Sequence, residues 1–309
     1  MRMENVTVVG SGGVMLPGKL WLPETEPKAL LQITHGMTEH IGRYTVLAEA
    51  LTAQGVAVAG FDLRGHGENP GSADCASFGE NGWKDSLEDM HLFYGELTQR
   101  FPEIPHIMLG FSLGSFLLRE YLNHYDDKVD GAVIMGTGQQ PGGILRLMMA
   151  IVKTQIKKAG FDQTTPLVKK LSFETYNKKF IPNRTDFDWL CSDESERESY
   201  MTDPLCRKSI SSGLFWQLLD SMKRTGSRSA YDRWNKTMPV LLLSGQEDPV
   251  GDFGKGVLQV KYAMESAGLK EVTMHLFPDA RHDLLHEESC GCAEDIRAIL
   301  CEWIGKIAG

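Results

Sequence analysis

The sequence contains no long apolar run and few cysteines, and both absences narrow the class of protein. No run approaches the roughly 20 apolar residues that span a bilayer, and the first residues, MRMENVTVVG, lack the apolar segment of a secretory signal peptide. We therefore expect a cytoplasmic protein. The six cysteines are too sparse for a disulfide scaffold or a paired C-x-x-C zinc site, so we expect free thiols. Cys290 and Cys292 form a C-x-C pair, but no second cysteine pair completes a tetrahedral zinc site, and we expect no bound metal.

Positive charge is scarce as well. The 309 residues hold 32 Lys and Arg against 41 Asp and Glu, which gives a net charge of −9. An acidic chain repels phosphate backbones, and no helix or loop concentrates enough Lys and Arg for groove binding, so we expect no nucleic-acid partner. With 42% apolar and 24% charged residues, the composition is that of a globular protein and excludes disorder, collagen and coiled coil. At about 150 residues per domain, the length allows one large domain or two smaller ones.

Short apolar runs rich in β-branched residues recur along the chain. Most are separated by segments with the period of amphipathic helices, and this alternation is typical of an α/β protein with a parallel sheet and crossover helices. The first two runs lie too close for an intervening helix, so we expect an antiparallel hairpin there. The predicted strands are 6–9, 19–22, 30–34, 56–61, 106–109, 131–135, 240–243 and 272–277. The predicted helices include 44–54, 83–101, 113–124, 256–267 and 293–307.

The alternation stops between Gly138 and Pro239, where the sequence is helix-like and contains no convincing strand. A structureless loop of that length is improbable in a compact domain, so we predict an inserted helical cap. The predicted division is a core of residues 1–138 and 236–309 and a cap of residues 139–235. Residues 141–235 hold 16 Lys and Arg and 11 Asp and Glu, so a basic cap at +5 lies on a body at −14.

The strongest motif is Gly110-Phe111-Ser112-Leu113-Gly114, which follows the predicted strand 106–109 and begins the predicted helix 113–124. This context is that of a nucleophile elbow, in which a serine on a strained turn is exposed above the sheet. Gly110 and Gly114 allow the close packing that such a turn needs. A serine hydroxyl is a weak nucleophile at neutral pH, so it requires a base and a carboxylate that orients the base.

The acid is expected after Ser112 in the chain, in the loop that follows strand 240–243. There the segment QEDPVG places Asp248 just past the carboxyl end of the strand, and Asp248 is the predicted acid. The rivals are Glu247, which is adjacent, and Asp252, which lies further into the loop.

The base is expected in the loop after the last strand, 272–277, where the segment DARHD contains His282. His282 is the predicted general base. His275 lies within the strand and is expected to pack there, whereas His286 is expected to be solvated.

Acyl transfer also needs hydrogen-bond donors aimed at the developing oxyanion. One is normally the backbone N–H that follows the nucleophile, here that of Leu113. The second comes from the loop after an earlier strand, and in HGMTEH at 35–40 the predicted donor is the N–H of Met37. Gly36 would let the backbone approach the substrate there.

The motifs together carry a family resemblance: H-G-x-x-E-H-x-x-R-Y at 35–44, D-x-R-G-H-G at 62–67, G-F-S-L-G at 110–114, S-G-x-x-D-P-V-G at 244–251 and A-R-H-D at 280–283. They resemble the monoacylglycerol lipase and lysophospholipase group of α/β-hydrolases over nearly the whole body of the chain. The resemblance implies an eight-stranded, mostly parallel sheet flanked by helices, with a helical cap between the sixth and seventh strands. It also implies a triad of Ser112, Asp248 and His282. The group is often called serine aminopeptidase after distant relatives, a name that does not by itself imply peptide cleavage.

Two residues depart from the lipase pattern. Thr38 occupies a position that is usually Gly, and Leu113 one that is usually Met. Neither change removes a backbone donor, but both alter the shape of the acyl pocket.

The resemblance implies hydrolysis of monoacylglycerol- or lysophospholipid-like esters through an acyl-enzyme, with no metal or organic cofactor. The expected partner is a small-molecule ester or lipid substrate; the oligomeric state stays open. A small-ester carboxylesterase and an iminopeptidase-type peptidase are alternatives, the latter because SDESERES at 192–199 offers carboxylates for a free amine. An acyltransferase or a cofactor-free haloperoxidase would change the acyl acceptor. A non-enzymatic ligand-binding homologue is an alternative from another class.

One cap segment is apolar and rich in methionine: 144–156 reads ILRLMMAIVKTQI, and several lysines follow it. We hypothesise that it forms a lid helix beside the substrate tunnel, since methionines suit adaptable pockets. The lysines would then attract an anionic lipid surface or a phosphate headgroup. The alternative is a helix that packs on its own subdomain and leaves its basic face in solvent.

Overall fold

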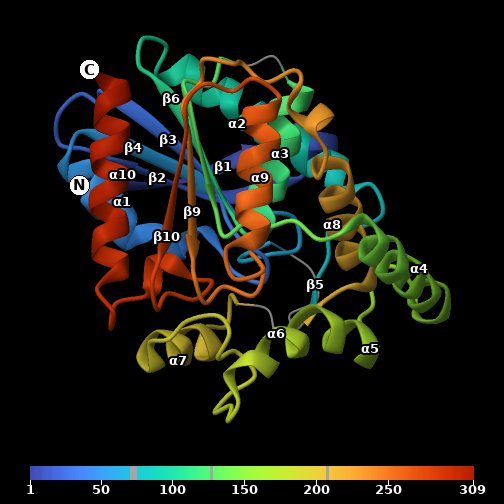
Figure 1. Cartoon of the computed structure of the whole chain (residues 1–309). Helices are drawn as coiled ribbons and strands as arrows, with labels where there is room; N and C mark the ends of the chain where they lie inside the picture. The colour runs from blue at the N-terminus through green and yellow to red at the C-terminus, as the bar shows by residue number, and fades with distance from the viewer. Residues whose placement is uncertain (70–74, 126–127, 207–208) are drawn as a thin grey trace.

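The fold is built on one mixed sheet. A computed structural model describes residues 1–69, 75–125, 128–206 and 209–309. Within these residues eight strands form the sheet in the order β1-β2-β4-β3-β6-β7-β9-β10 (Figure 1). β2 is antiparallel to β1 and to β4, and the strands from β4 to β10 in that order are parallel. The strands are β1 Arg2–Val9, β2 Met15–Leu22, β3 Ala29–Thr34, β4 Val56–Phe61, β6 His106–Phe111, β7 Gly131–Met135, β9 Val240–Gly245 and β10 Val272–Phe277.

Each predicted strand lies within an observed one, and the predicted antiparallel hairpin is β1 and β2. β3, β4, β6, β7 and β9 are buried along their whole length, because helices cover both faces of the sheet. These strands therefore read as continuous apolar runs. β1 lies at an edge of the sheet and instead alternates between more and less exposed residues.

Helices pack on both faces of the sheet (Figure 1). α1 and α10 cover one face, where Leu47 and Ile296 pack with Ile107 in one apolar cluster. α2, α3 and α9 cover the other face, where Leu117 and Val257 belong to a second cluster. The helices of the core are α1 Thr45–Ala53, α2 Gly82–Arg100, α3 Leu113–His124, α9 Lys255–Ser266 and α10 Cys292–Ala308, which match the predicted ones.

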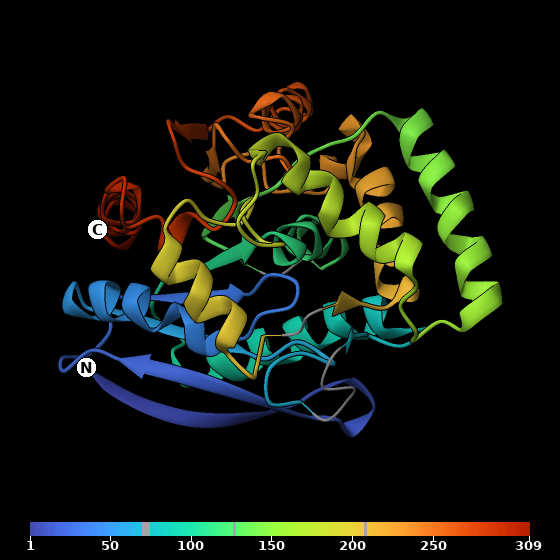
Figure 2. The same ribbon diagram turned by 90° about the horizontal axis from the view of Figure 1, so that it is seen from below.

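The chain leaves the sheet between β7 and β9 and forms the helices expected there. Figures 1 and 2 show α4 at the outer margin of the molecule, and it packs against α8. The helices of this part are α4 Gly142–Ala159, α5 Pro166–Lys169, α6 Thr175–Asn177, α7 Glu194–Thr202 and α8 Ser212–Thr225. The insert does contain one short strand, β8 Ser209–Ile210, which pairs in parallel with β5 Cys75–Ala76. Two residues are too few to show any period, so the sequence could not predict this small sheet.

Candidate active site

Ser112 connects β6 to α3 in a strained conformation. Its φ of 50° and ψ of −116° lie outside the ordinary regions for a residue with a side chain. The Ser112 N–H donates to Met135 O on β7 at 2.9 Å, which ties the turn to the neighbouring strand. A Cβ at Gly110 would lie 2.4 Å from Gly114 O, and one at Gly114 would lie 2.0 Å from Thr34 O. Only glycine fits at either position, and Ser112 thus has the geometry of a nucleophile elbow.

The structure brings the three predicted catalytic side chains into one hydrogen-bonded chain. His282 Nε2 lies 2.8 Å from Ser112 Oγ, and His282 Nδ1 lies 2.9 Å from Asp248 Oδ2. The other carboxylate oxygen of Asp248 accepts the Val250 N–H at 2.8 Å, which orients the carboxylate. β9 and β10 are parallel neighbours, so the loops that follow them carry Asp248 and His282 to the same edge of the sheet.

The environment of His282 favours its charged form. Burial lowers the pKa of His282, but the carboxylate of Asp248, supported by Asp283 and Glu39, outweighs burial and raises the pKa above its ordinary value. The ring packs between Phe111 and Trp189, with centroids 5.0 and 5.3 Å away.

The rival residues lie elsewhere. Glu247 and Asp252 are exposed, and neither bonds to His282. His286 is not solvated as expected, because its Nδ1 lies 2.8 Å from Asp283 Oδ1 and little of its side chain is exposed. His275 is half-buried on β10 and stacks with Phe277.

The predicted oxyanion donors lie beside Ser112 because β3 and β6 are parallel neighbours, with Thr34 opposite Gly110. The loop after β3, which carries Met37, therefore runs next to the turn that carries Ser112. Met37 and Ser112 line the same small cavity. Among the described residues no protein acceptor takes the N–H of Met37 or that of Leu113.

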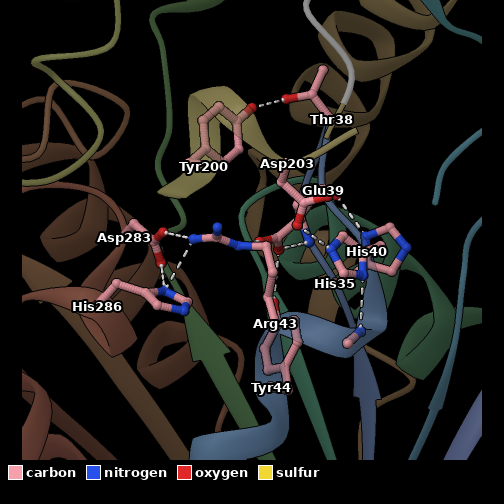
Figure 3. Close-up of polar contacts among 12 residues, drawn as sticks. His35, Thr38, Glu39, His40, Arg43, Tyr44, Tyr200, Asp203, Asp283 and His286 are labelled. Carbon is pink, nitrogen blue, oxygen red and sulfur yellow. Dashed lines mark hydrogen bonds and ion pairs between the residues drawn. The ribbon is translucent and has the colours of Figure 1, made fainter. Parts of the chain in front are cut away.

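The loop of Met37 is held by a buried carboxylate that the sequence analysis did not single out (Figure 3). Glu39 Oε1 accepts the Gly36 N–H at 2.6 Å and the Tyr44 hydroxyl at 2.9 Å, and Oε2 accepts Arg43 Nε at 3.1 Å. A Cβ on Gly36 would lie 2.8 Å from Glu39 Oε1, so Gly36 permits this contact. Burial raises the pKa of Glu39, although Arg43 opposes it.

Arg43 continues this network to the loop that carries His282. Its Nη2 donates to Asp283 Oδ2 at 2.6 Å, and Asp283 also contacts His286 (Figure 3). Burial disfavours both charges, but the pKa of Asp283 is lowered by His286 and Arg43, and that of Arg43 is raised by Asp283 and Glu39. The signals present in the sequence were the i,i+4 spacing of Glu39 and Arg43 and the position of Asp283 directly after His282.

Side chains of the cap close the site. Phe173, Trp189, Leu190 and Tyr200 line the cavity at Ser112, which has a volume of about 20 Å³. That is room for about one water molecule, so a substrate requires these side chains to move. No sequence motif marked these cap residues.

Thr38, one of the two departures from the lipase pattern, contacts the cap directly. Its φ is 64°, a left-handed conformation that a β-branched residue rarely adopts. Its hydroxyl lies 2.7 Å from the Tyr200 hydroxyl of α7 (Figure 3). Arg43 stacks on the Tyr200 ring at 5.1 Å, so the cap is joined to the core at this point.

The hypothesis that segment 144–156 forms a lid helix beside the substrate tunnel stays a prediction. The segment is helical, within α4, but it contributes no residue to the lining of the cavity at Ser112. Its apolar residues Leu145 and Val152 are buried in the core cluster that includes α8. The sequence correctly predicted a helix with an apolar face here, and that face packs within the cap.

One group among the described residues has the residue types of a metal site. Ligand atoms of His40, Asp203 and Cys206 lie within 4.8 Å of one another. His40 Nδ1 accepts the Gly42 N–H, so the ring proton is on Nε2, which faces Asp203 Oδ2 at 2.9 Å. A metal ion there would have to replace this proton. We therefore interpret His40 and Asp203 as a hydrogen-bonded pair.

Comparison with known proteins identifies relatives of the whole chain. A family model described as serine aminopeptidase, S33, matches residues 25–289. The monoacylglycerol lipase of Mycolicibacterium smegmatis is 26% identical over 288 residues, 90% of this chain and 89% of that protein. The monoglyceride lipase of Rattus norvegicus is 27% identical over 286 residues, 91% of this chain and 84% of that protein.

Solved structures show the same architecture. A lipase in an open form has a TM-score of 0.89 at 23% identity, and a carboxyl esterase from Bacillus coagulans in complex with glycerol has a TM-score of 0.88 at 19% identity. Each likeness covers 100% of both chains. They confirm the expected fold, with its eight-stranded, mostly parallel sheet and flanking helices.

Proposed function

Since the chain belongs to the serine aminopeptidase S33 family of α/β-hydrolases and is a serine hydrolase, we propose that it cleaves monoacylglycerol- or lysophospholipid-like esters with Ser112, His282 and Asp248. The observation that carries this proposal is the hydrogen-bonded chain from the strained Ser112 through His282 to Asp248, at 2.8 and 2.9 Å. The substrate class rests on the relatives named monoacylglycerol or monoglyceride lipase.

In the proposed acylation step, Ser112 Oγ attacks the ester carbonyl while His282 Nε2 takes the hydroxyl proton. Asp248 holds the Nδ1–H tautomer of His282 and stabilises the imidazolium that forms. His282 then gives the proton to the departing alcohol. Water repeats the sequence and releases the fatty acid.

The oxyanion of each tetrahedral intermediate binds to the N–H groups of Met37 and Leu113. Each such donor contributes roughly 3 kcal/mol to transition-state stabilisation. Glu39 accepts the N–H of Gly36 and so holds the loop that carries Met37 beside Ser112.

Ester cleavage fits the site better than removal of an N-terminal residue from a peptide. A free amine needs an unpaired carboxylate in the cavity, but the lining carboxylates Glu39 and Asp283 are both paired with Arg43. In the acidic segment 192–199, Asp193 caps α7 and Glu194 pairs with Arg184 at the surface. None of the carboxylates of that segment lines the cavity.

The cap contains further room beside the site. A cavity of about 210 Å³ shares Phe173 and Tyr200 with the cavity at Ser112. Its other lining residues are both apolar and charged: Phe187, Met201, Cys206, Lys169, Glu174 and Asp186. Movement of Phe173 and Tyr200 would join the two cavities and give room for a longer substrate.

We also propose that α4 makes transient contact with lipid surfaces. Its outer side exposes Ile144 and Leu147, which are 48% and 63% exposed, and basic residues lie along the same helix. None of the described helices is long and apolar enough to cross a bilayer. Flotation with anionic and neutral vesicles tests the contact: wild type should float with anionic vesicles, and Leu147→Glu should not. Equal absence of wild type from both vesicle fractions contradicts it.

The experiment that tests the function is hydrolysis of p-nitrophenyl esters from acetate to palmitate, together with labelling by a fluorophosphonate. Wild type should label and turn over, and Ser112→Ala should do neither while it unfolds at the same urea concentration. Ser115→Ala, at a serine on α3 whose hydroxyl donates to Ser112 O at 2.6 Å, is the matched control.

The acyl-length profile decides between the substrate classes. A preference for long chains supports a lipid substrate, and a preference for acetate supports the small-ester carboxylesterase. A well-folded wild type that neither labels nor hydrolyses any ester contradicts the catalytic proposal.

A further inference from the structure

The segment Cys290-Gly291-Cys292, at the start of α10, places two thiols next to each other. Cys290 is exposed, and Cys292 is 7% exposed. The Cys292 sulfur lies 4.0 Å from the Cys290 carbonyl oxygen. Gly291 has a φ of 74°, a left-handed conformation that glycine adopts without strain and that folds the chain into a turn between the two cysteines.

This spacing suits a disulfide. The Cα atoms of bridged cysteines lie within about 7 Å of each other. Two residues of chain span at most about 7 Å even when extended, and the turn at Gly291 shortens that span. No rearrangement of distant elements is needed to bring the sulfurs together.

The thiols also occupy both ends of the loop that carries the catalytic histidine. The Cys292 S–H donates to Pro278 O at 3.6 Å, at the start of the loop after β10. The Cys290 S–H donates to Glu287 O at 3.5 Å, at the end of the same loop. His282 lies between these two acceptors.

We propose that Cys290 and Cys292 form a redox-active dithiol that low-molecular-weight disulfides oxidise to an intramolecular disulfide. The Cys290 thiolate attacks one sulfur of the reagent disulfide, forms a mixed disulfide and releases one thiolate. The Cys292 thiol then loses its proton and attacks the Cys290 sulfur, which releases the second thiolate. The two cysteines lose two electrons and two protons, and the reagent disulfide becomes two thiols.

Exposure assigns the order of attack. Cys290 is open to solvent and meets the reagent. Burial, followed by the neighbouring Cys290 thiol, raises the pKa of Cys292 to about 12, so Cys292 reacts only after the mixed disulfide has formed beside it.

Oxidation changes the active-site loop. A disulfide has no S–H donors, so the contacts with Pro278 O and Glu287 O are both lost. Ala293 N–H still donates to Glu287 O at 3.1 Å, so that acceptor keeps one partner, and the loop loosens without unfolding.

The test is equilibration of the full-length protein in glutathione buffers from fully reduced to fully oxidised, followed by blocking with N-ethylmaleimide and peptide mass analysis. In wild type, the peptide that contains Cys290 and Cys292 should carry two N-ethylmaleimide groups after the reducing buffer and none after the oxidising buffer. Its mass after oxidation should be that of the unblocked dithiol less two hydrogen atoms, and the change should reverse with dithiothreitol. Cys292→Ser should stop at a glutathione adduct on Cys290. Cys301→Ser, a cysteine further along α10, should behave as wild type.

A second readout follows the loop. Oxidation should lower the rate of fluorophosphonate labelling in wild type and leave it unchanged in Cys290→Ser. The proposal fails if the wild-type peptide stays a dithiol in the most oxidising buffer, or if it accumulates only the glutathione adduct. The peptide mass needs no active enzyme, so this result is separate from the fate of the proposed function.

Discussion

Single residues at the site are held in conformations that their neighbours enforce. Ser112 and Thr38 both have positive φ, at 50° and 64°, and such strain persists only where the surroundings determine it. Ser112 is fixed by the bond of its N–H to Met135, and Thr38 by its bond to Tyr200. The geometry of this site therefore depends on two backbone conformations that residues with a side chain rarely adopt.

Asp248→Asn should shift the pH dependence of the enzyme. In the proposed mechanism His282 must be neutral to take the proton of Ser112, so kcat/KM should fall as the pH drops through the His282 pKa, which Asp248 raises. Without that carboxylate the acidic limb should move to lower pH, and the plateau should fall by about 10⁴-fold. The measurement is the pH profile of kcat/KM. Glu247→Gln, at the exposed neighbouring position, should leave the profile unchanged, and an unshifted limb in Asp248→Asn would contradict the assignment.

Asp283→Asn should destabilise the fold in a pH-dependent way. Removal of one partner of a buried ion pair costs about 3 kcal/mol at neutral pH, here by leaving Arg43 short of a carboxylate. The folded-state pKa of Asp283 is lowered, so its contribution is full above the ordinary Asp pKa of about 3.9 and is lost as the pH falls through the lowered value.

Urea unfolding at neutral pH and below about pH 4 checks this, since the gap between wild type and Asp283→Asn should narrow in acid. Asp220→Asn, which breaks a more exposed pair with Arg224, should cost less than about 1 kcal/mol. A gap of equal size at both pH values would argue against the ion pair as its source.

At the scale of elements, the packing of α3 against β3 and β6 sets the distance between Ser112 and the loop that carries Met37. β3 and β6 are adjacent and in register, and a single residue, Ser112, separates the end of β6 from the start of α3. At Gly114, α3 lies so close to the end of β3 that an added Cβ would meet the backbone of Thr34. The loop of Met37 continues from there.

Gly114→Ala should push α3 away from β3. The added Cβ would meet Thr34 O at 2.0 Å and His35 O at 2.7 Å, and a clash with backbone cannot relax by a rotamer change. We expect a loss of about 3 kcal/mol in the free energy of unfolding. The rate of fluorophosphonate labelling should also fall. Gly95→Ala in α2, where nothing lies within 4 Å, should instead gain about 1 kcal/mol. Equal stability of the two variants would contradict the packing argument.

At the scale of the whole molecule, cap and core are joined across the site. Tyr200 of α7 bonds to Thr38, and Asp203, just past α7, bonds to His40. These contacts close a cavity of about 20 Å³ over Ser112. Cap movement is therefore part of substrate entry.

Tyr200→Phe should make the cap open more readily. The variant keeps the ring but loses the hydrogen bond to Thr38, which contributes about 1 kcal/mol to stability. Stability should fall by about that amount, while labelling by a long-chain fluorophosphonate should rise up to about fivefold. Tyr262→Phe, at an exposed position on α9, is the control for loss of a hydroxyl. A parallel fall of labelling and stability would show that the contact aids catalysis instead of limiting entry.

The sequence by itself determined the features that depend on local order. Strand and helix periods, the glycines around Ser112 and the positions of Asp248 and His282 just after strands are all local patterns, and they predicted the fold and a candidate triad whose roles stay predictions. The order of strands in the sheet places β3 between β4 and β6 and so sets Met37 beside Ser112. Only the tertiary structure decided this order. The tertiary structure also decided the link from Glu39 through Arg43 to Asp283 and the choice of Tyr200 rather than α4 as the cover of the site. These contacts join residues that lie far apart in the chain. A local sequence period predicts which face of a helix is apolar, but it does not predict which other element that face packs against.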